Sequence, residues 1–195
     1  MNKTLVFIDD GFLSKLSFHF GNEKYLKLHR KDFSDFVCSK ENLKSEKTFV
    51  YLAPPFQSNN PTKDEEKRKE GYDRFVDSLR KEGIVVREGR CQRLKIGDKF
   101  KYTQKAVDVF LTMDLMRVLN DFSEIKKIIF VASDSDFVPV IQELYSKGIK
   151  TILYTYYDKD RNSRFSRSNH LIKSVHKYVK LTKEDFLEIV RKNEK

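Results

Sequence analysis

The sequence is poor in the residues that mark disulfide-stabilised or membrane proteins. Its 195 residues include two cysteines, Cys38 and Cys91, which are far apart and have no neighbouring Cys or paired His at metal-ligand spacing. We therefore expect neither a disulfide framework nor a zinc site, and we expect a reducing, cytoplasmic location. The first apolar run ends at Asp9 and is too short for a signal-peptide core or a membrane span, which argues against export and against a membrane partner.

Sequence features that divide a chain into parts are also scarce. With four prolines and seven glycines, the sequence has no low-complexity linker, and it has no internal repeat. A chain of this length can bury well over half of the surface that it exposes when unfolded. We therefore expect one domain over residues 1–195, with its own hydrophobic core.

Short apolar runs alternate with helical patterns along the chain. Five runs fit buried strands: residues 4–8, 48–53, 84–86, 127–132 and 149–154. Apolar residues at helical spacing predict five helices: near 13–20, over 62–83, from 103 to 119, over 137–147 and near 182–193. Residues 89–102 fit a hairpin or a basic loop. This alternation predicts an α/β fold with a parallel sheet of about five strands between two layers of helices.

The net charge of +10 is concentrated in two stretches. Residues 87–105 hold seven basic and two acidic residues, and residues 156–183 hold eight basic and two acidic residues, so the rest of the chain is close to neutral. Both stretches contain aromatic residues, among them Tyr102, Tyr156 and Phe165. Basic residues interleaved with aromatic rings suit a nucleic-acid backbone with bases that can stack, and a solvated lysine-rich face is the alternative explanation.

Aspartates follow two of the predicted strands. Asp9 and Asp10 come after the first strand, and Asp134 and Asp136 come after the fourth. In a doubly wound sheet these strands are neighbours, and their carboxyl ends meet where ligands bind. Asp108, in the helix that leads into the fourth strand, can approach from the side. Carboxylates this close repel one another unless a cation lies between them, and Mg²⁺ prefers oxygen ligands and phosphate.

Each of these residues also has a structural explanation. Asp136 directly precedes a helix and fits a helix cap, and Asp10 fits a turn. Asp114 lies six residues after Asp108, about 120° around the helix, so it is a doubtful fifth ligand. Lys105 would share the face of Asp108 and contact phosphate or pair with the aspartate. The four histidines are scattered, and we expect them to be structural or exposed.

Three segments together resemble the NYN domain family (LabA-like), a branch of the PIN-like nuclease superfamily. They are the apolar run that ends at Asp9, the stretch Lys105-Ala-Val-Asp108 with Asp114 following, and Ser133-Asp134-Ser-Asp136-Phe-Val-Pro before Gly148. The resemblance extends from residue 4 to about 181. It departs from the family at Phe12, where an Asn is usual, and at His176, where an Asp is frequent.

The resemblance implies a Rossmann-like, PIN-like fold and hydrolysis of RNA phosphodiester bonds. The implied catalytic and metal-binding acids are Asp9, Asp108, Asp134 and Asp136, with Asp114 as a further ligand, and the cofactor would be Mg²⁺ or Mn²⁺. The residues predicted to contact nucleic acid are Lys105, Arg161, Arg164, Arg167 and Ser133. The RNA could be single-stranded or structured, and the sequence leaves open whether the chain forms a homodimer.

Two other functions remain open from the sequence alone. The chain could be a non-catalytic RNA-binding or regulatory module that keeps the fold and the basic surface. A phospho-accepting receiver domain would also use an acidic pair after the first strand, but it needs an Asp after the third strand, where this chain has Arg87 and Glu88.

Overall fold

A six-stranded parallel sheet forms the centre of the molecule. The structure, a computed structural model, describes residues 2–158, 160, 163 and 165–192. The sheet strands are β1 (Asn2–Asp9), β2 (Leu43–Leu52), β3 (Val85–Glu88), β6 (Lys127–Val131), β7 (Lys150–Thr155) and β8 (Lys177–Lys180). Their order is β3-β2-β1-β6-β7-β8, and every neighbouring pair is parallel.

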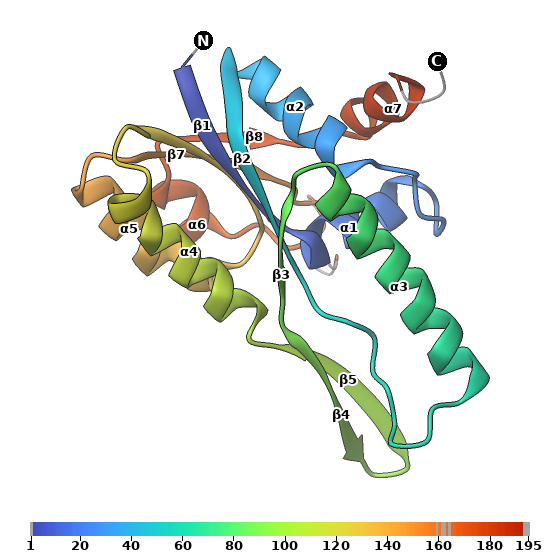
Figure 1. The fold of residues 1–195 in the computed structure, drawn as a ribbon. Coiled ribbons are helices and arrows are strands. Elements are labelled where there is room, and N and C mark those ends of the chain that lie inside the picture. The colour runs from blue at the N-terminus through green and yellow to red at the C-terminus, as the bar shows by residue number, and fades with distance from the viewer. Residues whose placement is uncertain (1, 159, 161–162, 164, 193–195) are drawn as a thin grey trace.

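Helices cover both faces of this sheet (Figure 1). One face carries α1 (Asp10–Phe20), α2 (Arg30–Lys40), α3 (Lys63–Lys81) and α7 (Lys183–Lys192). The other carries α4 (Val107–Asp121), α5 (Val138–Ser146), which follows the short 3-10 helix η1 (Ser135–Phe137), and α6 (Asn169–Ser174). The predicted α/β fold, a parallel sheet between two helical layers, is confirmed.

The core consists of two apolar layers, one on each side of the sheet. Successive residues of a strand point to opposite faces, so Val6 and Ile8 of β1 pack with α1 and α2, whereas Leu5 and Phe7 pack with α4 and α5. A strand that is apolar on both faces appears in the sequence as a continuous apolar run, so such strands could be predicted from the sequence.

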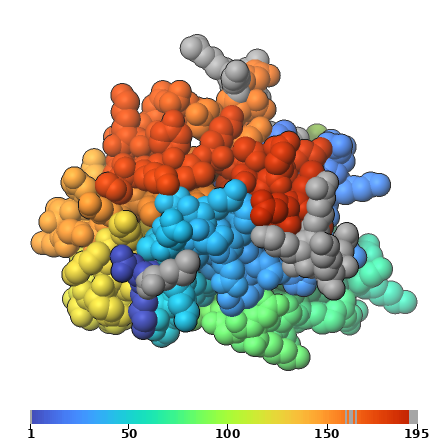
Figure 2. Space-filling view, turned by 90° about the horizontal axis from the view of Figure 1, so that it is seen from above, coloured from blue at the N-terminus to red at the C-terminus, as the bar shows by residue number. Residues whose placement is uncertain are grey.

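The C-terminal helix completes the first layer. The ring of Phe186 on α7 lies 5.1 Å from that of Phe20 and 6.0 Å from that of Phe33, measured between centroids. Figure 2 shows the C-terminal residues, in red, against α2 and β2, in blue and cyan. The last helix is therefore part of the packed core of the described chain.

A sixth strand and a short helix were not expected, and helix α4 begins later than expected, whereas a hairpin was one of the two predictions for residues 89–102. The sheet has a sixth strand, β8, and a short helix, α6, in a basic stretch without an apolar run. Residues 90–105 form a hairpin, β4 (Arg90–Ile96) and β5 (Lys99–Lys105), which projects from the carboxyl edge of the sheet (Figure 1). Because β5 pairs with β4 as far as Lys105, helix α4 begins at Val107 and not at Thr103.

None of the helices in the described part of the chain combines the length and the apolar character that crossing a membrane requires.

Candidate acidic active site

A pocket opens at the carboxyl edge of the sheet between β1 and β6. These strands are neighbours, as predicted, and Ile8 pairs with Val131, so the residues that follow them emerge side by side. The pocket has a volume of about 220 Å³. Its lining residues are Asp9, Gly11, Phe12, Lys15, Gln104, Asp108, Ser133, Asp134 and Phe165. Three of the predicted acids and Ser133 therefore share one pocket.

Two of these aspartates also cap helices. One carboxylate oxygen of Asp9 accepts a hydrogen bond from the Phe12 backbone N–H at 3.2 Å, at the start of α1. One oxygen of Asp134 accepts from the Asp136 backbone N–H at 2.9 Å, at the start of η1. The capping role expected for Asp136 thus belongs to Asp134. Capping fixes each carboxylate and leaves its second oxygen available to a ligand.

Asp108 reaches the pocket because the base of the hairpin passes close to the end of β3. A Cβ at Gly89 would lie 2.4 Å from the Lys105 carbonyl oxygen and 2.7 Å from a methyl of Val107, so only glycine permits this approach. Ala106 then adopts a left-handed conformation, with φ at 68°, before α4 begins. Asp108 lies in the first turn of that helix.

The carboxylates perturb one another. Burial raises the pKa of Asp9 to about 6, and the charges of Asp108 and Asp10 add to this rise. The pKa of Asp108 is raised by burial and by the charges of Asp134 and Asp136. Lys15 opposes both shifts. The pocket therefore carries more negative charge than its own cation neutralises.

Lys15 and Gln104 belong to this pocket although they were not predicted to be there. Lys15 lies four residues after Gly11 on α1, so both residues face the same way from the helix. Gly11 was not among the predicted site residues, so this spacing carried no signal for Lys15 in the sequence. Gln104 comes from β5, and its position depends on the direction in which the hairpin projects, for which the sequence carries no local signal.

Two other aspartates are bound elsewhere. Asp10 is buried and paired with Arg30 at 2.5 Å, so it is not the simple turn residue that was expected. Asp114, whose side chain is 5% exposed, accepts two hydrogen bonds from Arg87, at 2.8 and 3.0 Å, and one from the Tyr51 hydroxyl at 3.1 Å. Its carboxylate thus ties α4 to β2 and β3, away from the acidic pocket.

The remaining predicted residues lie around the pocket or outside the part of the chain that the structure describes. Asp136 does not line the pocket, but it is near enough for its charge to raise the pKa of Asp108. Lys105 ends strand β5, so the expected shared helix face with Asp108 was wrong. Arg167 lies over the Tyr157 ring, 5.0 Å from its centroid. Arg161 and Arg164 lie outside the described residues.

His176 is remote from this edge of the sheet. It directly precedes β8, and its backbone N–H donates to the Thr151 carbonyl at 3.1 Å, near the amino ends of β7 and β8. The acidic pocket lies at the carboxyl ends. The residue at position 176 therefore does not contribute to the pocket, whereas Phe12 does line it.

The chemistry of the pocket fits a hard divalent cation. Carboxylate and hydroxyl oxygens are its main potential ligands, and the pKa values of Asp9 and Asp108 are raised first by burial and then by the charges of neighbouring aspartates. Among the residues that the structure describes, however, no three His, Cys, Asp or Glu side chains already converge closely enough to hold a metal ion. A metal would have to draw the carboxylates together.

A doubly wound sheet with carboxylates at its switch point has the architecture of a nuclease-like α/β protein. A family model described as the NYN domain matches residues 22–182, and the chain belongs to this family, within the PIN-like nuclease superfamily. Members are typically nucleases that act on RNA and generally use divalent metals. The match begins after Asp9, so the assignment of Asp9 to the site depends on its position in the fold.

Comparison with solved structures agrees on the fold. The chain is similar to a protein of unknown function from Vibrio parahaemolyticus, with a TM-score of 0.60 and 18% identity, over 95% of this chain and 95% of that one. At this identity the likeness concerns the fold alone. A comparison with curated proteins found no significant match.

Proposed function

We propose that the protein is a metal-dependent endoribonuclease that hydrolyses RNA phosphodiester bonds at the acidic pocket. The observation that supports this proposal most is the meeting of Asp9, Asp108 and Asp134, from three separate elements, in one pocket with a lysine. Asp136 would act beside them. Membership of the NYN family adds support for RNA as the substrate class.

In this proposal, Asp9, Asp108 and Asp134 hold Mg²⁺ or Mn²⁺, with Asp136 as a neighbouring carboxylate. When bound, the metal would activate a water molecule and neutralise the phosphate. Asp9 and Asp134 keep their orientation because one oxygen of each accepts a helix-capping hydrogen bond. Lys15, the cation of the pocket, holds a non-bridging phosphate oxygen, and Ser133 offers its hydroxyl to the RNA backbone.

The β4–β5 hairpin would guide RNA toward the pocket. One of its faces carries Gln104 at the pocket, then the cross-strand pair Arg93 and Tyr102, then Lys95 and Phe100. Tyr102 and Phe100 are each 53% exposed, so about half of the surface of each residue is open to solvent and to a ligand. A row of cations and open rings that ends at carboxylates suits a single-stranded backbone with stacked bases.

Cleavage assays test the catalytic part of the proposal. Labelled RNAs are incubated with Mg²⁺ or Mn²⁺, using the wild type, Asp134→Asn and Asp98→Asn, which changes an exposed carboxylate in the hairpin turn. We expect metal-dependent cleavage, a loss of at least about 10- to 100-fold for Asp134→Asn, and no loss for Asp98→Asn. Equal loss in both variants would contradict the site.

A non-catalytic RNA-binding module is the second candidate, and one observation favours it. The described residues contain no ready-made group of three metal ligands. If no RNA is cut with either metal while binding stays strong and salt-sensitive, the nuclease proposal fails and the binding module replaces it.

The hairpin has its own test, which does not depend on cleavage. Removing one lysine–phosphate interaction with a single strand lowers the slope of log affinity against log salt by about 0.7. We expect this change for Lys95→Ala and none for Lys44→Ala, which removes an exposed lysine at the amino edge of the sheet. Equal slopes for wild type and Lys95→Ala would remove this part of the hairpin from the interface.

A further inference from the structure

A second, larger pocket lies next to the acidic pocket. Its volume is about 710 Å³, within the range of about 300–1,000 Å³ that ligand sites occupy. Its lining residues are Lys15, Phe18, His19, Asn22, Glu23, Tyr25, Ser163 and Phe165. Lys15 and Phe165 also line the acidic pocket, so the two pockets are adjacent and share these two side chains.

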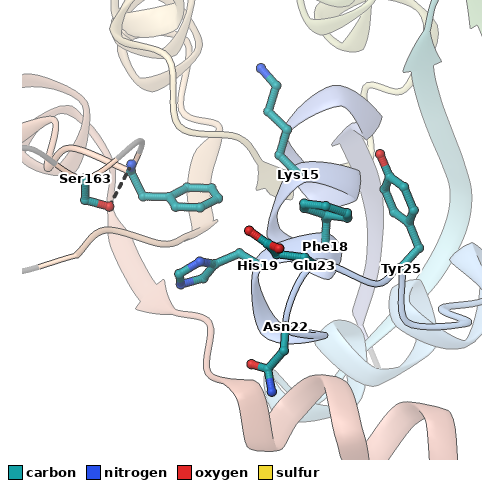
Figure 3. Close-up of a pocket in the computed structure, with 8 residues that line it drawn as sticks. Lys15, Phe18, His19, Asn22, Glu23, Tyr25 and Ser163 are labelled. Carbon is teal, nitrogen blue, oxygen red and sulfur yellow. Dashed lines mark hydrogen bonds between the residues drawn. The ribbon is translucent and has the colours of Figure 1, made fainter.

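Aromatic side chains form the walls of this pocket. The rings of Phe18 and Tyr25 lie 5.1 Å apart between centroids, and the rings of His19 and Phe165 are separated by the same distance. Tyr25 is nevertheless 70% exposed. Figure 3 shows Lys15 and Asn22 at opposite ends of this wall, with Phe18, His19 and Tyr25 between them. Open, paired rings of this kind provide a stacking surface.

The turn after α1 has an unusual backbone, and two of its polar residues, Asn22 and Glu23, line the pocket. A Cβ at Gly21 would lie 1.9 Å from the Lys24 carbonyl oxygen, so the turn can close only around a glycine. Asn22 and Glu23 then have φ values of 52° and 64°, the left-handed region that non-glycine residues seldom adopt. Such strain persists where the surrounding structure fixes it, and it is often found at binding sites.

We propose that this aromatic pocket binds one base of a single-stranded RNA, next to the phosphate that enters the acidic pocket. The inference rests on the proposed function and deepens it, because it names a base-binding subsite. The base stacks on Phe18 and Tyr25, and the amide of Asn22 and the carboxylate of Glu23 meet its hydrogen-bonding edge. Lys15 stands at the junction of the two pockets, where it neutralises the phosphate that joins base and scissile bond.

The occupant follows from three properties of the pocket. Its rings offer a flat apolar surface, one of its lining residues is the lysine that also lines the acidic pocket, and it lies next to the site proposed for the phosphodiester. A purely apolar ligand would leave Lys15, Asn22 and Glu23 without partners. A nucleotide supplies an anionic phosphate for Lys15, a ring for the aromatic wall, and an edge with donors and acceptors for Asn22 and Glu23.

A binding assay without metal tests the subsite separately from catalysis. A 5′-labelled oligoribonucleotide is titrated with protein in EDTA and followed by fluorescence anisotropy, for wild type, Tyr25→Ala and Tyr145→Ala. Tyr145 is the matched control, since it is 60% exposed on α5 and does not line the pocket. We expect Tyr25→Ala to weaken binding at least about fivefold, the effect of removing one stacked base, and Tyr145→Ala to have no effect.

Oligonucleotides with one abasic position then identify the base. At one position the abasic substitution should weaken wild-type binding, and Tyr25→Ala should cause no further weakening there, because both changes remove the same interaction. Effects that multiply at every position, or a Tyr25→Ala variant that binds like the wild type, would overturn the subsite. Phe18→Ala should give the same coupling as Tyr25→Ala.

The two proposals fail in different ways. Coupling between Tyr25→Ala and one abasic position, without cleavage by any metal, would support the base subsite and reject the nuclease. Metal-dependent cleavage that Asp134→Asn abolishes, without such coupling, would support the nuclease and reject the subsite.

Discussion

The carboxylate of Asp9 should make the folded protein less stable at neutral pH than at acidic pH. Burial raises its pKa from the usual 3.8 to about 6. Below about pH 3.8 the carboxyl group is protonated in the folded and the unfolded chain alike, so the perturbation has no effect. Between these values the folded state keeps a proton that the unfolded state has lost, and stability therefore falls as the pH rises. The loss is complete above about pH 6.

The size of this effect follows from the pKa. A difference of one pKa unit between the folded and the unfolded chain corresponds to about 1.4 kcal/mol of stability. A rise of the Asp9 pKa from 3.8 to about 6 therefore corresponds to at most about 3 kcal/mol. Asp9 is only half-buried by its accessible surface, and solvent screens part of the effect. We expect Asp9→Asn to stabilise the protein by about 1–2 kcal/mol at pH 7–8. The amide oxygen of Asn can still accept the Phe12 N–H, so the helix cap remains.

Urea unfolding of wild type and Asp9→Asn from pH 3.5 to 8 in EDTA measures this difference. The stabilisation by Asn should grow with pH up to about 6 and then stay constant. Asp98→Asn, which replaces an exposed carboxylate in the hairpin turn, is the matched control. Two results would refute the conclusion that burial and neighbouring charges raise the pKa of Asp9. One is a stability difference between wild type and Asp9→Asn that does not vary with pH, and the other is an Asp9→Asn variant less stable than wild type at pH 7–8.

Three further substitutions test the structural account. Asp114→Ala should destabilise the fold by about 3 kcal/mol in urea unfolding, because Arg87 and Tyr51 lose a buried partner; a neutral result would free Asp114 for another role. Thr62→Ala should cost about 1 kcal/mol through removal of the capping box on α3 and leave RNA cleavage unchanged. Gly21→Ala should cost about 1–3 kcal/mol in thermal unfolding, because its Cβ meets a backbone oxygen, and wild-type stability would contradict the close approach of Lys24 to Gly21.

The sequence was sufficient where one local pattern determines an element. Five of the six sheet strands were found because each contains an apolar run, and the runs in β1, β6, β7 and the second half of β2 are buried on both faces. β3 contributes only the half-buried pair Val85 and Val86. The sixth, β8, is an edge strand with the sequence Lys-Tyr-Val-Lys, and its outer side faces solvent. It forms because Ile152–Thr155 of β7 offers free backbone groups, a tertiary cause that residues 177–180 alone do not reveal.

The site was predictable to the extent that it depends on the ends of strands. Asp9 ends β1, and Ser133 and Asp134 come shortly after β6, so the strand order brings them together. Asp114 could not be assigned from its helical angle, because its position is set by Arg87, which belongs to a different strand. Gln104 and the course of Lys105 depend on the hairpin, whose direction is fixed only when Gly89 packs against Val107.

Helix α1 and the turn after it link the two pockets. Asp9 caps the start of the helix, Lys15 lies at the junction, and Asn22 lies just beyond its end. Lys15 and Phe20, the last residue of the helix, are five residues apart, or about 7.5 Å at the helical rise of 1.5 Å per residue, and Asn22 follows two residues later. A helix packed on the core changes this length very little, so the position of a base relative to the acidic pocket would be set by one rigid element. Variants that alter Tyr25 should therefore change which bond is cut or how tightly RNA binds, whereas variants of Asp134 should change whether any bond is cut.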